Sequence, residues 1–400
     1  MVKVAFINIY GQSGLSFQKL VELENFIQKY KLDIVGLQET NIDEDTFSEC
    51  NYIYKNYFPI YNNNKSGYGT CMLVKKEFTI SNIVKDSDGR VICLDIDDQL
   101  TIVNIYLPSG TDQKSKIERE SMIDNLPNLL LYKKENGIMG GDFNSITDKQ
   151  DSLLHPEQKM SKCFRKIIKL YNPCDSFRQL YPNEEQFSRY YVWKGGRGAT
   201  RIDRCYSWGT LKVNTAVYHA ISFSDHLAHV VNFQSSADLY QNESPRKRSI
   251  YRIKHWLLKD SIFLDNIRVE FQNWLEIKDH FSPIYFWEEI VKPSIKKLAI
   301  IREREINKER NQELQALQLK LNYHLYKLRE NKVKGFAQRL ANYDLAKQNL
   351  NDFYQKRAKI ILYQNRSEVF EMSDSTKIYH YESLDRYIRQ SNFKKIEVNG

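Results

Sequence analysis

Short apolar stretches separated by turn-forming residues run through the first 240 residues of the chain. They are rich in β-branched and aromatic side chains, and their length and composition are typical of β-strands. The predicted strands are 2–10, 33–39, 69–75, 91–97, 100–108, 137–143, 190–193, 201–208 and 228–233.

A second pattern, with apolar residues three or four positions apart, predicts helices between some of these strands. Leu20, Leu23 and Phe26 show this spacing, and Ser16 is the predicted N-cap of their helix, Ser16–Tyr30. Further helices are predicted over Lys114–Lys134 and Ser161–Leu170. Many strands with a few interspersed helices indicate an α/β architecture, either two-layered or a sandwich.

The pattern changes near residue 240. Residues 236–249 are polar and hold Pro245 and a basic cluster, which is typical of a linker. After them the strand patterns fade, and leucines recur every three or four residues at Leu314, Leu317, Leu321, Leu325 and Leu328. This stripe predicts an amphipathic helix in a helical hairpin or short coiled coil, packed on its own domain or on a partner helix. We therefore divide the chain into a domain over 1–235, a linker over 236–249 and a helical region over 250–400.

The composition is that of a globular protein, because 42% of the 400 residues are hydrophobic and 27% are charged. No apolar run approaches the roughly 20 residues of a membrane span, and Met1–Tyr10 lacks the flank and cleavage site of a signal peptide. The six cysteines form no CxxC pair, which favours free buried thiols in a reducing compartment over disulfides or a zinc site. We expect an intracellular protein, nuclear or cytoplasmic, without a membrane partner.

The excess positive charge of the chain lies in its second part. The net charge is +9, of which residues 1–240 carry −1 and residues 241–400 carry +10. A basic segment of this kind favours a polyanionic partner, most simply nucleic acid. A solvated helical surface rich in lysine would explain the same charge, and the two interpretations stay open at this point.

Polar side chains stand where the predicted strands end, which is where sheet enzymes commonly carry their catalytic groups. The candidates are Asn8, Gln38, Glu39, Thr40, Tyr106, Pro108, Asp142, Asn144, Asp203, Ser224, Asp225 and His226. Carboxylate oxygens suit Mg²⁺, which polarises a phosphate and stabilises its leaving oxygen. A histidine held by a carboxylate can stabilise phosphoryl charge, and a carboxylate beside an asparagine can activate water. This set indicates metal-assisted hydrolysis of a phosphodiester.

Four short motifs carry a resemblance to a known family. GDFN at Gly141–Asn144, QET at Gln38–Thr40, RID at Arg201–Asp203 and SDH at Ser224–His226 resemble, in order and separation, those of the endonuclease/exonuclease/phosphatase family. That family includes pancreatic DNases, apurinic endonucleases, inositol-polyphosphate phosphatases and bacterial sphingomyelinases. The resemblance covers about residues 1–235 and implies a DNase-like four-layer α/β sandwich there, followed by a mostly helical basic region.

The resemblance also implies a metal site. Glu39 matches the principal Mg²⁺ ligand of the family, with Mn²⁺ as a possible substitute, and Asn8 matches a residue that supports the metal. Asp225 matches a residue near the metal and the leaving group. No other cofactor is implied.

Five further residues match groups that handle water and phosphate. Asp142 and Asn144 correspond to the pair that orients or deprotonates the attacking water, and Tyr106 to a tyrosine that contacts the scissile phosphate. His226 corresponds to the phosphate-binding histidine, and Asp203 to the carboxylate paired with it. Whether Asp142 or His226 is the dominant general base stays open.

The chain departs from the apurinic-repair enzymes in two places, with Tyr10 and Ser109 where those enzymes have Asp and Asn. The stretches 174–182 and 190–208 instead resemble the endonucleases of LINE-type non-long-terminal-repeat retrotransposons. In that branch the loop around 194–201 lies near DNA, so the resemblance implies DNA contacts by four of its residues. These are Lys194, Arg197, Thr200 and Arg201. A plain basic hairpin is the alternative.

The helical region resembles the segment that joins endonuclease to reverse transcriptase in such elements. Residues 357–381 resemble the stretch just before the polymerase fingers, and no Tyr-x-Asp-Asp motif occurs, so we expect a front piece of a polyprotein or a truncated copy. The implied function is a Mg²⁺-dependent DNA endonuclease that nicks target DNA to leave a 3′-OH primer for retrotransposition, with element RNA as a second partner of the helices. The alternatives are a phosphatase or phospholipase of the same fold, or a non-enzymatic remnant that binds nucleic acid.

Overall fold

The computed structural model of the protein describes most of the chain. The described residues are 1–10, 16–40, 56–63, 69–110, 112–131, 133–153, 162–193, 196–234, 253–330 and 335–373. The predicted linker over 236–249 lies outside them.

The strands are β1 (Val2–Asn8), β2 (Ile34–Gln38), β3 (Tyr57–Asn63), β4 (Gly69–Lys75), β5 (Ile80–Lys85), β6 (Val91–Ile96), β7 (Leu100–Tyr106), β8 (Asn136–Asp142), β9 (Cys174–Asp175), β10 (Arg189–Trp193), β11 (Gly196–Thr200), β12 (Asp203–Trp208), β13 (Lys212–His219) and β14 (Ala228–Gln234). The α-helices are α1 (Phe17–Tyr30), α3 (Gln113–Leu129), α4 (Lys162–Tyr171), α5 (Ser176–Leu180), α6 (Ser261–Ile277), α7 (Pro283–Tyr285), α8 (Lys292–Arg329) and α9 (Phe336–Ser373). Every strand and helix predicted before residue 240 has a counterpart here, with bounds shifted by a few residues.

The described strands form two six-stranded mixed sheets and a hairpin. The first sheet has the order β13-β14-β1-β2-β4-β3 and the second the order β5-β6-β7-β8-β12-β9, while β10 and β11 pair with each other. The central pairs β1–β2 and β7–β8 are parallel, and β14 and β12 run antiparallel beside β1 and β8. This pairing decides which strand ends meet.

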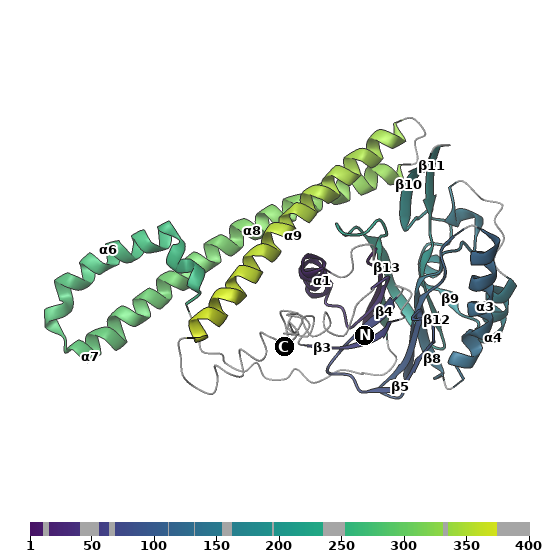
Figure 1. Ribbon diagram of the computed structural model, residues 1–400, viewed down its shortest axis with the longest axis horizontal. Helices are drawn as coiled ribbons and strands as arrows, with labels where there is room; N and C mark the ends of the chain where they lie inside the picture. Colours follow the sequence, from purple (N-terminus) through teal and green to yellow (C-terminus); the bar gives the residue numbers. More distant parts are fainter. Residues whose placement is uncertain are drawn as a thin grey trace, which may run out of the picture. The chain divides into compact units, whose positions relative to one another are not determined.

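The two sheets pack face to face between two layers of helices (Figure 1). Helix α1 covers the outer face of the first sheet with Leu20, Leu23, Phe26 and Ile27, and its N-cap Ser16 accepts a hydrogen bond from the backbone N–H of Lys19. Helices α3 and α4 cover the second sheet in the same way. The predicted four-layer α/β sandwich is thus confirmed.

Close contact between the sheets depends on a glycine in β8. A Cβ at Gly140 would come within 2.2 Å of the Phe6 ring from β1, so any larger residue would push the layers apart. Next to this contact, the side-chain amide of Asn104 donates to the carbonyls of Leu37 and Cys71 at 2.9 and 3.0 Å. The sheets are therefore joined by hydrogen bonds as well as by apolar packing.

The chain divides into two compact units, and the division differs from the one predicted at residue 235. The first unit contains Met1–Gln241 together with Leu321–Tyr354, and the second contains Asn242–Lys320 and Gln355–Gly400. The predicted helical character of the C-terminal region is confirmed. Of the leucine stripe, Leu321, Leu325 and Leu328 are buried, so the end of α8 packs as part of the first unit.

The second unit has a small core of its own, in which Leu257, Phe263 and Ala299 are fully buried. Asp260 caps α6 and is held by both ends of the Arg302 guanidinium at 2.9 and 3.1 Å. In the described part of the chain, no helix has both the length and the apolar composition that crossing a membrane requires.

The described cysteines are free. Three of them, Cys71, Cys93 and Cys205, are buried, as predicted, whereas Cys174 is exposed.

Candidate active site

The candidate residues meet at one edge of the sandwich because of the sheet topology. Asn8, Tyr106 and Asp142 stand at the carboxyl ends of parallel strands β1, β7 and β8, and Glu39 directly follows β2. Strand β12 runs antiparallel to β8, so its first residue, Asp203, lies opposite Asp142. Strand β14 runs antiparallel to β1, which brings the segment just before it, Ser224–His226, to the same edge.

Asn8 joins two carboxylates at the centre of the site. Its side-chain nitrogen donates to Glu39 Oε1 and to Asp142 Oδ2, both at 3.0 Å. Its amide oxygen accepts from the backbone N–H of Tyr10 at 2.9 Å, and because that N–H can only donate, it fixes the orientation of the amide. Asn8 therefore supports the site by orienting Glu39 and Asp142, and its part in a metal site stays a prediction.

Tyr106 lies on the other side of Glu39. Its hydroxyl donates to Glu39 Oε1 at 3.1 Å, and the Arg90 guanidinium lies 5.0 Å from the centre of its ring. Burial and the charge of Glu39 raise the pKa of Tyr106 above its usual range, so the phenol stays protonated and can donate a hydrogen bond. Glu39 itself is only half-buried and has a left-handed φ of 57°, which turns the chain sharply at the end of β2.

Asp142 is 1% exposed and accepts hydrogen bonds from Asn8 and from the backbone N–H of Asn144, the latter at 2.8 Å. Burial and the neighbouring Asp203 raise the pKa of Asp142 above the ordinary aspartate value. The turn after β8 depends on Gly141, where a Cβ would come within 2.0 Å of the carbonyl oxygen of Ile105. The side-chain nitrogen of Asn144 donates to the Leu107 carbonyl at 2.8 Å and braces this turn.

His226 and Asp203 form a buried pair. Nδ1 of the imidazole lies 2.8 Å from Asp203 Oδ2, and the Asp203 backbone carbonyl accepts from the Tyr218 hydroxyl at 2.7 Å. Burial alone would lower the pKa of His226, but the charges of Asp203, Asp142 and Asp225 raise it to about 9. The imidazole is therefore cationic at neutral pH, with Nε2 turned away from Asp203 and available to an anion.

Asp225 is held by Arg189, a residue that the sequence reasoning missed. The Arg189 guanidinium lies 2.8 Å through Nε and 2.6 Å through Nη2 from Asp225 Oδ2. Arg189 begins β10 and forms an isolated antiparallel bridge with His226, so the hairpin β10–β11 is joined directly to the segment Ser224–His226. The only sequence signal was its position at the start of the predicted strand 190–193.

The donors fit a hard divalent cation. Oδ1 of Asp225 is buried, accepts no hydrogen bond among the described residues and lies 4.0 Å from His226 Nε2. One ligand atom each of Asp142, Asp203 and His226 lie within 4.8 Å of one another. Asp203 and His226 already bind each other, so Glu39, Asp142 and Asp225 are the carboxylates that could hold a metal.

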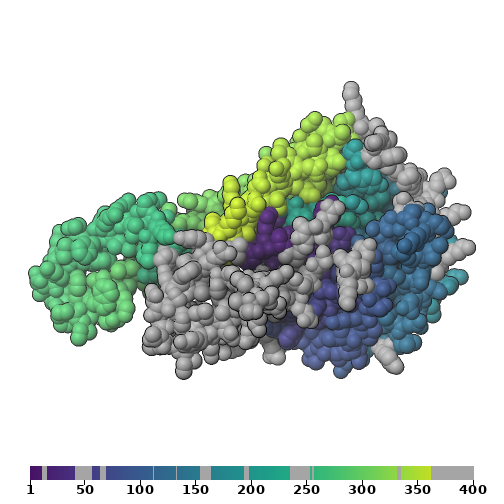
Figure 2. Space-filling model, in the orientation of Figure 1, coloured from purple at the N-terminus to yellow at the C-terminus, as the bar shows by residue number. Residues whose placement is uncertain are grey.

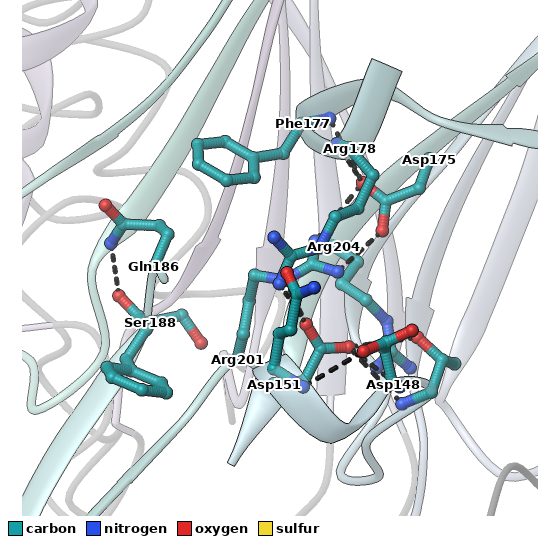
Figure 3. A network of polar contacts seen from close by, with 12 residues as sticks. Asp148, Asp151, Asp175, Phe177, Arg178, Gln186, Ser188, Arg201 and Arg204 are labelled. Carbon is teal, nitrogen blue, oxygen red and sulfur yellow. Dashed lines mark hydrogen bonds and ion pairs between the residues drawn. The ribbon is translucent and has the colours of Figure 1, made fainter. Parts of the chain in front are cut away.

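The prediction that Arg201 contacts DNA is corrected by its burial. Arg201 is 0% exposed, and its guanidinium lies 2.7 Å from Asp151 and 2.8 Å from Asp175 (Figure 3). Arg178 reaches the same Asp151 oxygen at 2.8 Å, so the Asp-x-x-Arg pattern at 175–178 serves this buried network. Arg201 orients the chain just before Asp203 and is closed off from any phosphate.

The other predicted DNA contacts are not tested here. Lys194 and the side chain of Arg197 lie outside the described residues. Thr200 ends β11, pairs with Arg189 and is half-buried, with its carbonyl accepting from the Ser188 backbone N–H at 2.9 Å. A DNA contact by its hydroxyl stays a prediction.

The segment Ser222–His226 is fixed from the helix α1 side by Glu22. Glu22 is 4% exposed and accepts from the backbone N–H of Ser222 at 2.7 Å and from its hydroxyl. Two residues later, the Ser224 hydroxyl donates to the Asn8 carbonyl at 2.7 Å and accepts from the His226 N–H at 3.0 Å. These bonds connect the first sheet to the histidine.

Burial raises the pKa of Glu22 from 4.5 to about 7, so its ionisation should make stability depend on pH. Between these pH values the folded protein keeps a proton that the unfolded chain releases, and the free energy of unfolding therefore falls as pH rises. Glu22→Gln cannot ionise, so its free energy of unfolding should not fall in this way. Relative to the unsubstituted protein, that free energy should rise by roughly 3 kcal/mol on going from acidic to mildly alkaline pH. Urea unfolding of both proteins at pH 4.5 and pH 8 checks this; parallel pH profiles would contradict it.

Sequence comparison relates the chain to known proteins. The sequence profile of the Endonuclease/Exonuclease/phosphatase family matches residues 5–226, more than half of the chain. The "Transposon TX1 uncharacterized 149 kDa protein" of Xenopus laevis is 22% identical over 309 residues, which are 75% of this chain and only 23% of that protein. Exodeoxyribonuclease III of Haemophilus influenzae is 30% identical over 206 residues, 44% of this chain and 76% of that protein.

Solved structures agree on the fold. An AP endonuclease from Archaeoglobus fulgidus has a TM-score of 0.51 at 20% identity, covering 59% of this chain and 100% of its own. A 3′ phosphatase from Neisseria, bound to a product DNA hairpin, has a TM-score of 0.50 at 18% identity over the same share of each chain. The fold, the profile match over 5–226 and the 30% identity to exodeoxyribonuclease III lead to one conclusion: the chain belongs to the endonuclease/exonuclease/phosphatase family.

Proposed function

We propose that the protein is a Mg²⁺-dependent DNA endonuclease of a LINE-type retrotransposon, which nicks one strand and leaves a 3′-OH primer. The observation that carries the proposal is the joining of Glu39 and Asp142 through Asn8, beside the buried His226–Asp203 pair. In the proposed reaction, cation-binding oxygens, a carboxylate that activates water and an imidazolium act on one phosphate.

Each residue has a distinct part in this chemistry. The Tyr106 hydroxyl and the cationic His226 bind non-bridging phosphate oxygens, and Asp203 holds the imidazole in its orientation. Asp142, raised in pKa by burial, takes up the proton of the attacking water, while Asn144 keeps the Asp142 carboxylate in place through its N–H. In this assignment Asp142 is the general base, because His226 already carries a proton.

The metal would be held by the carboxylate of Glu39, and the carboxylates of Asp142 and Asp225 would lie near it. When bound, Mg²⁺ supplies positive charge that stabilises the phosphate and its leaving oxygen. Mn²⁺ accepts the same oxygen ligands and is an expected substitute.

Two observations favour DNA over a lipid or an inositol phosphate as substrate. The relatives and neighbours above include an exodeoxyribonuclease, an AP endonuclease and a transposon protein. Residues 241–400 carry a net charge of +10, which suits binding of a nucleic acid, including element RNA. The free cysteines suit a reducing compartment inside the cell.

We expect Glu39→Gln to abolish nicking at low Mg²⁺, because the neutral amide keeps the shape of the side chain and loses the charge that binds the metal. The loss of rate should be at least about 100-fold and should be partly recovered at high Mg²⁺. The measurement is conversion of supercoiled plasmid to open circles, with a Mg²⁺ titration and with EDTA.

Glu118→Gln is the matched control, because Glu118 is an exposed carboxylate on α3 paired only loosely with Lys114 at 3.9 Å. It should nick at the unsubstituted rate. Extension of the nicks by a DNA polymerase without prior phosphatase treatment tests for the 3′-OH end. Unchanged Mg²⁺ dependence in Glu39→Gln would refute the metal assignment, and hydrolysis of phosphorylated inositols without plasmid nicking would favour the phosphatase alternative.

A further inference from the structure

Helix α9 contributes to the first unit close to the candidate active site. Its residues Tyr343, Ala346, Leu350 and Tyr354 are buried at helical spacing on one face. On this side Asn351 accepts from the Gln18 side chain of α1 through Oδ1 at 2.5 Å and through its backbone carbonyl at 3.1 Å. Figure 2 shows α9, in yellow-green, directly against the purple surface of α1.

Lys347 projects from the same face of α9 toward the catalytic segment. Its Nζ donates to the backbone carbonyl of Ser224 at 2.5 Å. Ser224 is 2% exposed and immediately precedes Asp225 and His226, and its hydroxyl already bonds to the Asn8 carbonyl and the His226 N–H. The ammonium group thus holds the backbone carbonyl of a residue that also links β1 to His226.

Carboxylates surround Lys347. Burial lowers the pKa of its ammonium, and the charges of Asp344, Asp225 and Glu22 act against this shift. A cavity of about 450 Å³ adjoins the contact, and the residues that line it include Gln18, Ser222, Phe223, Lys347 and Asn351. Without the lysine, the Ser224 carbonyl would lose its donor and the segment would have space in which to shift.

The end of α8 contacts Tyr218, which in turn bonds to Asp203. Arg329 donates to the Tyr218 carbonyl at 3.4 Å, and its charge acts on the buried Tyr190 of β10. The Tyr218 hydroxyl in turn bonds to the Asp203 carbonyl. Helical residues from 321–354 therefore support both Asp203 and the segment of His226.

We propose that Lys347 is a positioning residue of the endonuclease, which fixes Asp225 and His226 by holding the Ser224 carbonyl. This inference rests on the proposed function. The catalytic unit would then not end at residue 235. Part of helix α9, which lies within Leu321–Tyr354 and more than a hundred residues later in the chain, would help to position the site.

The test compares Lys347→Met, Lys347→Arg and the control Asn351→Ala in the full chain. We expect Lys347→Met to slow single-turnover nicking at saturating enzyme by about 10- to 100-fold, because small misplacements of catalytic groups have effects of this size. DNA affinity should change little. Lys347→Arg keeps a cationic donor, has the adjoining cavity to occupy and should recover most of the rate. The Asn351 side chain contacts α1 and not Ser224, so Asn351→Ala should nick at the unsubstituted rate.

A second readout is independent of activity. In protein labelled with ¹⁵N-histidine, Lys347→Met should shift the imidazole resonances of His226, and Asn351→Ala should leave them in place. If Lys347→Met does not fold, Lys347→Gln, whose amide is too short to reach Ser224, replaces it.

Unshifted His226 resonances, a rate for Lys347→Met close to the unsubstituted one, or an equal loss in Asn351→Ala would each overturn the positioning role. An unsubstituted protein that does not nick DNA, but whose His226 resonances respond to Lys347→Met, would remove the proposed function and keep the contact.

Discussion

Replacing either member of the His226–Asp203 pair should slow nicking by about 10²- to 10⁴-fold, and replacing both should be no worse than the more damaging single change. The reason is that the two residues act as one unit. Asp203 Oδ2 lies 2.8 Å from Nδ1 of His226. Burial alone would lower the pKa of His226, but the neighbouring carboxylates raise it to about 9 and keep the imidazole charged. His226→Ala removes the cation, and Asp203→Ala removes the group that orients and charges it.

Single-turnover nicking rates of Asp203→Ala, His226→Ala and the double variant, at saturating enzyme, measure the coupling. Asp265→Ala, which removes an exposed carboxylate on α6, is the control for loss of a charge without loss of the site. Losses that add in the logarithm of the rate would show that Asp203 and His226 work separately. The rate of the unsubstituted protein should also fall as pH rises through about 9, where His226 loses its proton.

The largest expected effect on stability comes from Asp151. Its Oδ1 lies 2.7 Å from Arg201 and 2.8 Å from Arg178, and both Asp151 and Arg201 are fully buried (Figure 3). The arginines lower the pKa of Asp151 below its usual range. In Asp151→Ala, Asp175 would be the one carboxylate left to balance the charges of Arg201 and Arg178, and the Arg201 guanidinium is in the interior. The variant should therefore lower the free energy of unfolding by about 3–5 kcal/mol.

Urea unfolding followed by tryptophan fluorescence measures this loss. Asp124→Ala is the matched control, because Asp124 pairs with Lys166 at 2.7 Å on the surface, with side chains 56% and 62% exposed, and should cost at most about 1 kcal/mol. Asp151→Asn keeps an acceptor for the arginines and should fall between the two. Equal small losses in Asp151→Ala and Asp124→Ala would mean that the buried network contributes no more than a surface pair.

Most of the strands predicted from the sequence are largely buried. Strands β4, β6 and β7 are buried along almost their whole length, and apolar residues make up most of each. Strands β5 and β13 lie at sheet edges and mix exposed with buried positions, and no strand was predicted for either. They are strands because β5 pairs with β6 and β13 with β14. A local sequence pattern carries no information about such pairing.

Local sequence also determined which side chains stand at the strand ends, because a polar residue after an apolar run is visible in one dimension. Tertiary structure decided which of them meet. Asp142 and Asn8 are 134 positions apart and touch only because β1 and β8 belong to packed sheets with parallel central pairs. The same holds for Arg189, which became a site residue through its pairing with Asp225.

Arg201 and Lys347 show the limit most clearly. A cationic side chain has the same sequence signature on a DNA-binding surface, in a buried ion network or against a carbonyl. Arg201 was assigned to DNA from its neighbourhood, whereas Asp151, 50 positions away, and Asp175, 26 positions away, claim its guanidinium. Lys347 lies in a region that its charge marked only as basic. The sequence by itself determined the family, most strands of the core and the residue types of the candidate site. The folded chain decided which charges are neutralised inside it, because that depends on partners distant in sequence.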